Sequence, residues 1–190
     1  MDNYKKEFLE ALDFTETILS KKPTVNPQNE KILTDDVMKN LLNTIKNEFG
    51  EINSKELLGN CLAANDAFFD IIKKCLGCEI YYTIGWLQEG DIPVFYTPES
   101  ELKRYAEHGI SSLPSLKLNL HVWLTLPTME IIDITIRTTY AQIFNKPEGI
   151  GGIIAGHPYE LFKGEFQYHP QIIGVEYLRK IGVLIDLKIF

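Results

Sequence analysis

Apolar residues recur at a helical spacing of three or four in two segments near the start of the chain. Residues 3 to 20 and residues 35 to 48 each carry such a stripe, and this period predicts amphipathic helices. Asp35 and Asp36 suit the start of the second helix, and Gly50 suits its end. We interpret the proline-containing segment between the helices as a loop and not as a domain boundary, because the first helix is too short to bury its stripe alone.

A third helix is predicted directly after Asn60. The sequence CLAANDAFFDIIKKCLG follows this residue, and asparagine is a favourable residue at the cap of a helix N-terminus. Gly77 suits the end of the helix. Asp66, Asp70 and two lysines form one narrow polar face, and the other positions are small or apolar. Such a helix is nearly surrounded by protein, and Cys61 lies in its first turn.

From residue 78 the spacing of apolar residues changes towards an alternation typical of strands. The segments EIYYTIGWLQ, IPVFY, LKLNLHVWLTL and EIIDITI are rich in β-branched and aromatic residues and predict strands. TPESELKRYAEHG predicts a short helix between them, with Thr97 or Ser100 as its cap. Residues 176 to 182 suggest a helical turn or two, and residues 183 to 190 a closing strand. Helices followed by an antiparallel meander predict an α+β fold.

Length and charge narrow the classes of function. The 190 residues, 45% of them hydrophobic, predict a single domain over residues 1–190. Within it we expect a helical lead (1–50), a core (55–140) and C-terminal strands and loops (141–190). The chain has 19 basic and 26 acidic residues, a net charge of −7. This balance argues against nucleic acid and against an anionic membrane surface as partners. The sequence does not indicate an oligomeric state.

The cysteine content and the amino terminus indicate the compartment. Three cysteines are too few for a disulfide framework, and an odd number leaves at least one thiol. The N-terminal residues alternate charged and apolar side chains, unlike a secretory signal. No segment approaches the roughly 18 to 20 apolar residues of a membrane span. We therefore expect a cytoplasmic location by default, and signal-less export is left open.

Cys61 occupies a position at which a thiol gains reactivity. The N–H groups and the dipole of a helix start favour an anion, so the thiolate of Cys61 should be stabilised there. The backbone N–H of the same residue can point at a developing oxyanion. The alternative is that Cys61 is a small buried apolar residue, and its position alone does not decide between the two.

Two polar residues interrupt the apolar strands further along. His121 lies within LKLNLHVWLTL, and Asp133 lies among isoleucines in EIIDITI. A hairpin loop with an odd number of residues would put both side chains on the same face, and an even number would separate them. On the same face, Asp133 can orient His121, and His121 can take a proton from Cys61.

Each of the two residues also has an ordinary interpretation. His121 could be a core histidine bonded to a backbone carbonyl, and Asp133 could be a turn or cap acid. An uncompensated carboxylate in a buried strand is costly, however. A pair whose members satisfy each other accounts for both residues better than two separate accidents do.

Taken in order, these segments resemble the transglutaminase-like superfamily of papain-like cysteine enzymes. In that superfamily a nucleophilic cysteine begins a helix, a histidine two residues before a tryptophan lies on the next strand, and an aspartate lies on the following strand. GNCLAANDAFFDIIKKCLG, LHVWLTL and IIDIT match this order within residues 55–140. The resemblance implies that Cys61 is the nucleophile, His121 the general base and acid, and Asp133 the orienting carboxylate.

The resemblance also implies a papain/transglutaminase-like core, in which the cysteine-bearing helix packs on an antiparallel sheet. Asn60 is a candidate for oxyanion stabilisation, and Trp123 matches a flanking position that could contribute to substrate binding or to structure. The implied activity is that of a hydrolase or acyltransferase, whether peptidase, amidase, deamidase or transglutaminase. It would act on a peptide or protein amide through a thioester, with no cofactor and no metal.

Two other readings compete with this one. The same fold could be a non-catalytic binding or inhibitor module. Cys75 and Cys78 form a C-x-x-C, but no second such pair or closely spaced histidine pair completes a zinc site. His157 and His169, each before a proline, are interpreted as loop residues, and His108 as a partner of a helix C-terminus.

Overall fold

A computed structural model of the protein describes residues 3–49, 61–110, 118–162 and 166–184. Helices and antiparallel strands together build the described chain, so the predicted α+β class is confirmed. The chain forms two compact units. The first unit comprises Met1–Thr24, Thr83–His121 and Gly164–Phe190, and the second comprises Val25–Tyr82 and Val122–Lys163. Among the described helices, none has the length and apolar character needed to cross a membrane.

Three antiparallel strands of the sheet lie in the first unit. β1 (Tyr81–Glu89), which enters this unit at Thr83, pairs with β2 (Ile92–Val94) on one side and with β6 (Phe166–Ile173) on the other. Gly90, at a φ of 57°, makes the tight turn between β1 and β2. β6 corrects one expectation from the sequence. His169 lies within this strand, opposite Trp86 of β1, and not in a loop.

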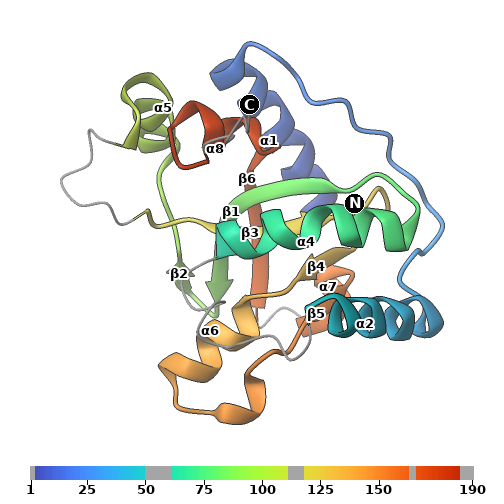
Figure 1. Ribbon diagram of the computed structural model, residues 1–190. Helices are drawn as coiled ribbons and strands as arrows, with labels where there is room; N and C mark the ends of the chain where they lie inside the picture. Colours follow the sequence, from blue (N-terminus) through green and yellow to red (C-terminus); the bar gives the residue numbers. More distant parts are fainter. Residues whose placement is uncertain (1–2, 50–60, 111–117, 163–165, 185–190) are drawn as a thin grey trace, which may run out of the picture. The chain divides into compact units, whose positions relative to one another are not determined.

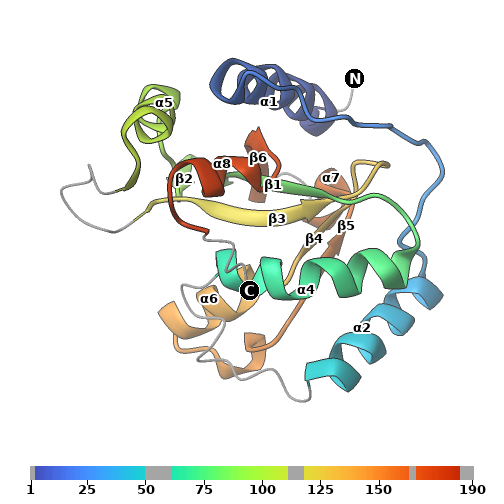
Figure 2. The ribbon, with the colours of Figure 1, turned by 45° about the horizontal axis from the view of Figure 1, so that its top comes forward.

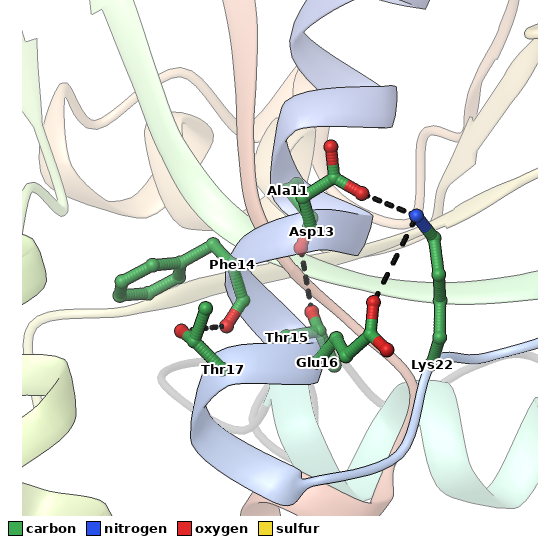
Figure 3. Close-up of polar contacts among 7 residues, drawn as sticks. All are labelled: Ala11, Asp13, Phe14, Thr15, Glu16, Thr17 and Lys22. Atoms are coloured by element: carbon green, nitrogen blue, oxygen red, sulfur yellow. Dashed lines mark hydrogen bonds and ion pairs between the residues drawn. The ribbon is translucent and has the colours of Figure 1, made fainter.

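Helix α1 (Asn3–Leu19) packs along β6, and the ribbons in Figure 1 show the two side by side. Thr15, which is fully buried, joins them. Its hydroxyl donates to Ala11 O at 2.7 Å, the bond drawn in Figure 3, and accepts from Ile173 N at 2.9 Å. The predicted apolar stripe of this helix therefore covers a strand from the other end of the chain.

The end of α1 is held by charges at its surface. Ser20, with a φ of 55°, follows the helix in a left-handed conformation and donates its N–H to Glu16 O. Lys22 then turns back and pairs with Asp13 and with Glu16 (Figure 3). The hydrogen bond that Lys22 donates to Asp13 raises the pKa of the Lys22 ammonium. Because these groups are exposed, the ion pairs contribute little to the free energy of folding. They hold the segment after α1 close to the surface of the helix.

Two short helices complete the first unit. α5 (Glu99–His108) and α8 (Glu176–Lys180) are joined by the buried Tyr177 hydroxyl, which donates to Leu102 O at 3.0 Å. The predicted side-chain cap of α5 is wrong. Pro98 occupies the cap position without a side-chain bond, and the hydroxyl of Thr97 donates instead to Asn119 O. Gly109, with a φ of 72°, ends α5 and donates its N–H to Tyr105 O.

A second antiparallel group of strands belongs to the second unit. β3 (His121–Thr125) pairs with β4 (Ile131–Asp133), which pairs with β5 (Ile154–Gly156). His121 itself is the last residue of the first unit, and β3 continues into the second unit from Val122. Leu126 N donates to Glu130 O, which leaves residues 127–129 as the hairpin loop between β3 and β4.

Helix α4 (Cys61–Leu76) has the bounds that the sequence predicts, and it packs against α2 (Asp35–Phe49) in both ribbon views (Figures 1 and 2). Gly77, at a φ of 63°, ends α4. The buried carboxylate of Glu130 accepts from the N–H groups of Ile32 and Leu33. It thereby holds the segment before α2 against the hairpin of β3 and β4.

The predicted strand over residues 130 to 136 is too long. β4 ends at Asp133, and helix α6 (Ile136–Ile143) follows at once. The chain continues through the short helices η2 (Pro147–Gly149) and α7 (Pro158–Phe162). From residue 185 on, the predicted closing strand lies outside the described residues. The proposal of one domain over residues 1–190 stays a prediction.

Candidate active site

Cys61 is the first residue of α4, in the second unit, and it is partly exposed. A thiol at this position meets the N–H groups of the first helical turn, which favour a negative charge. Asn60, the candidate for helix cap and oxyanion donor, lies outside the described residues.

Asn65, one turn after Cys61, is a buried polar residue that the sequence analysis missed. Its side chain is fully buried, and its Nδ2 donates to Cys61 O at 2.8 Å and to Val122 O at 3.1 Å. These two bonds join the first turn of α4 to β3. Its Oδ1 is buried with no hydrogen-bond partner among the described residues. The spacing of four from Cys61, on the buried face of the helix, was the available signal.

Tyr82 is a second residue that the sequence did not single out. Its ring packs near Phe69 of α4, and its hydroxyl donates to Leu62 O at 3.1 Å. Burial raises the pKa of the Tyr82 phenol strongly, and the charges of Cys61 and Asp66 raise it further. The phenol therefore stays protonated near the start of α4, where it acts as a donor and not as a base.

Asp133 ends β4 and is fully buried. Its Oδ1 accepts from the backbone N–H groups of Thr135 and Ile136, both at 3.0 Å, and from the Thr135 hydroxyl at 3.3 Å. Asp133 thus caps the start of α6, one of the roles considered for it. All three bonds end on the same oxygen, which fixes the orientation of the carboxylate.

His121 begins β3 and is 2% exposed. Within the first unit its ring stacks on Phe95, with centroids 5.4 Å apart and planes 23° apart. Phe95 has a φ of 60°, an unusual backbone conformation for an aromatic residue. Such conformations persist where the surrounding structure requires them, and they are concentrated at functional sites.

The register of β3 against β4 fixes which residues share a face. Leu124 lies opposite Ile132, and Thr125 lies opposite Ile131. Since side chains alternate along a strand, odd-numbered positions of both strands point to the same side. Trp123, on that face, is fully buried, so its indole packs in the interior. The structure places Cys61, Trp123 and Asp133 in the second unit and His121 at the end of the first.

The other two cysteines lie around the end of α4. Cys75 Sγ is 3.7 Å from Thr44 Oγ1 and 3.6 Å from Asn40 Nδ2, both on α2. Burial raises the pKa of the Cys78 thiol, and the neighbouring charges of Glu79 and Glu130 raise it further. Across the described part of the chain, no three His, Cys, Asp or Glu side chains group as metal ligands. The surroundings of Cys75 and Cys78 are those of structural thiols.

No protein-family model, no curated protein and no solved structure matches this chain. The contacts and exposures of its own residues therefore provide the support for a function.

Proposed function

We propose that the protein is a cysteine-dependent acyl-transfer enzyme with a papain/transglutaminase-like core. His121 takes the proton of the Cys61 thiol, and the sulfur attacks an amide or ester carbonyl. The tetrahedral intermediate collapses to a thioester as His121 returns the proton to the leaving amine or alcohol. Water or a second amine then attacks the thioester, which regenerates the thiol and yields an acid or a new amide.

The observation that carries this proposal is the register of the β3–β4 hairpin. A triad requires His121 and Asp133 at positions of the same parity on paired strands. Thr125 opposite Ile131 gives that parity, because odd-numbered positions then share one face. A slip of one residue would have separated the two side chains.

Asn65 supports the role of Cys61. Through this buried amide, the first turn of α4 is bonded to Val122, which follows His121 directly in the chain. We propose that Asn65 is a positioning residue that holds the nucleophile's turn against β3. A polar bridge is an expensive feature in an otherwise apolar interface unless it fixes a geometry.

Asp133 suits the orienting role because its carboxylate is held rigidly. Three donors on Oδ1 fix the plane of the group, so Oδ2 is the atom that we assign to the ring of His121. In such a triad the carboxylate sets the tautomer and the orientation of the imidazole. Capping α6 and orienting His121 use different oxygens and are compatible.

The substrate class follows from the chemistry of a thiol nucleophile and from the resemblance. We propose a peptide or a side-chain amide of a protein as the acyl donor. No cofactor takes part in the proposed steps, because the thiol, imidazole and carboxylate carry every proton and bond change. The lead helices and the cytoplasmic location remain part of the same proposal.

Capture of the acyl-enzyme tests this function. Wild-type protein and the variants Cys61→Ala and His121→Ala would be incubated with a mixed panel of peptides, amides and thioesters, and analysed by intact-mass spectrometry. We expect a covalent adduct on Cys61 in the wild type, product release on longer incubation, and neither in Cys61→Ala. An absence of adduct and product across the panel, while Cys61 remains alkylatable, would contradict the proposal.

One observation favours a second candidate. The carboxylate of Asp133 already has a structural role at the start of α6, as it would in a non-catalytic binding module. In such a module His121→Ala would change stability alone, and no panel member would be converted. The same mass-spectrometry experiment therefore separates the two candidates.

A further inference from the structure

A pocket in the first unit lies at the β1–β2 hairpin. Its volume is about 360 Å³, and it is lined by Trp86, Gln88, Asp91, Pro93 and Tyr96. Gln88 lies opposite Pro93 in the register, and Trp86 shares their face because side chains alternate along β1. None of these residues belongs to the proposed triad.

Aromatic rings form the walls of this pocket. Trp86 stacks on His169, with centroids 4.1 Å apart, and meets Tyr96 edge to face at 5.1 Å and 74°. Glu7 holds the His169 ring in place through a 2.8 Å bond to Nδ1. In an edge-to-face pair, at least one face of Tyr96 remains uncovered by Trp86. Tyr96 is also 42% exposed, so a ligand can reach that face.

Two residues of the pocket, Asp91 and Gln88, contribute acceptor oxygens. Asp91 contributes an exposed carboxylate. Gln88 donates one N–H of Nε2 to Gly90 O at 2.8 Å, and its carbonyl oxygen is an acceptor that it can offer. No lining residue is basic, and the chain has a net charge of −7. An aromatic face beside a carboxylate favours a cation, because the ring's negative face and the carboxylate attract the same charge.

We propose that this pocket binds the cationic side chain, lysine or arginine, of a peptide. The charged head would lie between the Tyr96 ring and the Asp91 carboxylate, and its aliphatic stem would pack on Trp86 and Pro93. That the peptide is the acyl donor rests on the function proposed above. The binding of the cation does not.

A strained residue connects this pocket to His121 within the first unit. Phe95, adjacent to Tyr96, stacks on the His121 ring and has a φ of 60°. The two neighbouring rings meet different partners, Phe95 the histidine and Tyr96 the Trp86 ring. A peptide side chain bound against Tyr96 would therefore contact the residue next to Phe95, whose ring stacks on the proposed base. Phe95 therefore links the pocket to the ring of His121 within the first unit.

Binding of short peptides to full-length Cys61→Ala protein tests the proposal without turnover. The probes are blocked pentapeptides that differ only in a central arginine, lysine, citrulline or glutamate, measured by calorimetry and by tryptophan fluorescence. We expect the arginine and lysine peptides to bind about tenfold tighter than the citrulline peptide. This preference should weaken in about 0.5 M salt, because the partners are exposed.

Variants of the pocket identify the groups responsible. Asp91→Asn should remove most of the preference for arginine over citrulline, and Tyr96→Leu should weaken both cationic peptides. Glu99→Gln, at an exposed acid outside the pocket lining, is the charge-matched control and should behave like its parent. Equal binding of arginine and citrulline peptides, or a preference that survives Asp91→Asn, would overturn the proposal. So would an absence of binding at millimolar concentrations.

The outcome is independent of the acyl-transfer test. If no acyl-enzyme forms but the cationic peptides are selected, the pocket stands and the enzyme proposal fails. If an acyl-enzyme forms without any preference for a cation, the pocket proposal fails alone.

Discussion

At the residue scale, buried polar side chains determine how segments of this molecule are joined. Asn65, Asp133 and Glu130 are each nearly or fully excluded from solvent. Asn65 and Glu130 bond to backbone groups of another segment, and Asp133 bonds to the N–H groups at the start of the helix that follows it. Leaving such groups without partners costs more than a typical bond contributes. These three side chains therefore specify how the segments around the proposed nucleophile are joined.

Substitution of Asn65 tests its role as a bridge. Asn65→Ala leaves Val122 O without this donor, so we expect the free energy of unfolding to fall by about 1–2 kcal/mol. Because Asn65 also holds the first turn of α4, alkylation of Cys61 should slow while that of Cys75 is unchanged. Urea denaturation and peptide mass spectrometry measure the two effects.

Asn43→Ala is the matched control for this change. Asn43 is exposed on α2, so its loss should alter stability by less than about 0.5 kcal/mol. If Asn65→Ala is as stable as this control and Cys61 reacts at the wild-type rate, Asn65 is not a positioning residue.

The sequence predicts single positions well where one physical rule dominates. Gly77 ends α4 as its lack of a side chain predicts. It fails where a polar residue serves a distant segment. Thr97 was expected to cap its own helix, but its hydroxyl bonds Asn119. Local spacing contains no information about such partners.

At the element scale, the first helix depends on a strand from the far end of the chain. α1 packs on β6, and the buried Thr15 hydroxyl accepts from Ile173 N. The helical stripe was readable from the sequence, whereas β6 was not, because Pro170 interrupts the strand and a proline is a sign of a loop. The strand predicted over residues 130 to 136 was too long because its apolar residues continue past Asp133. The Asp133 side chain ends the strand by accepting from the first N–H groups of α6.

Thr15→Val tests the connection between α1 and β6. The substitution keeps the shape of the side chain and leaves the buried Ile173 N–H without its acceptor, so we expect a loss of about 1–3 kcal/mol of stability. Amide exchange at Ile173 should accelerate as well. Thr17→Val is the control, because Thr17 is exposed and bonds only within α1, to Phe14 O (Figure 3). Equal stabilities of the two variants would show that the bond contributes nothing.

At the scale of the whole molecule, each unit contains a buried tyrosine whose hydroxyl donates to a backbone carbonyl. These are Tyr82 in the second unit and Tyr177 in the first. Burial raises the pKa of both phenols in the folded state. The unfolded phenol has a pKa near 10. The stability that they contribute is therefore complete below pH about 10 and is lost as the pH rises above it.

Denaturation between pH about 9 and about 12 measures this effect. For each buried phenol, the free energy of unfolding should fall by about 1.4 kcal/mol per pH unit above the unfolded pKa. Tyr82→Phe and Tyr177→Phe should each flatten this alkaline slope. Tyr159→Phe, at a tyrosine that is 78% exposed, should keep the wild-type slope. Identical slopes in all four proteins would refute the account of these two residues.

Fold class and site residues differ in how far the sequence predicts them. The α+β class and the bounds of α4 follow from period and capping, and both are confirmed. The division into two units was not visible, because each unit is assembled from segments far apart in the chain. The triad of Cys61, His121 and Asp133 stays a prediction, for which the register of β3 against β4 is now defined.

Alkylation of the three thiols tests the central claim most directly. Near pH 6 to 7, Cys61 should react with iodoacetamide at least about tenfold faster than Cys75 and Cys78, as an activated thiolate does. Cys78 is an internal reference because burial raises its pKa. His121→Ala should abolish the advantage of Cys61, and His108→Ala, at an exposed histidine, should preserve it. If Cys61 reacts no faster than Cys75, or if His121→Ala leaves its rate unchanged, the proposed nucleophile and base are contradicted.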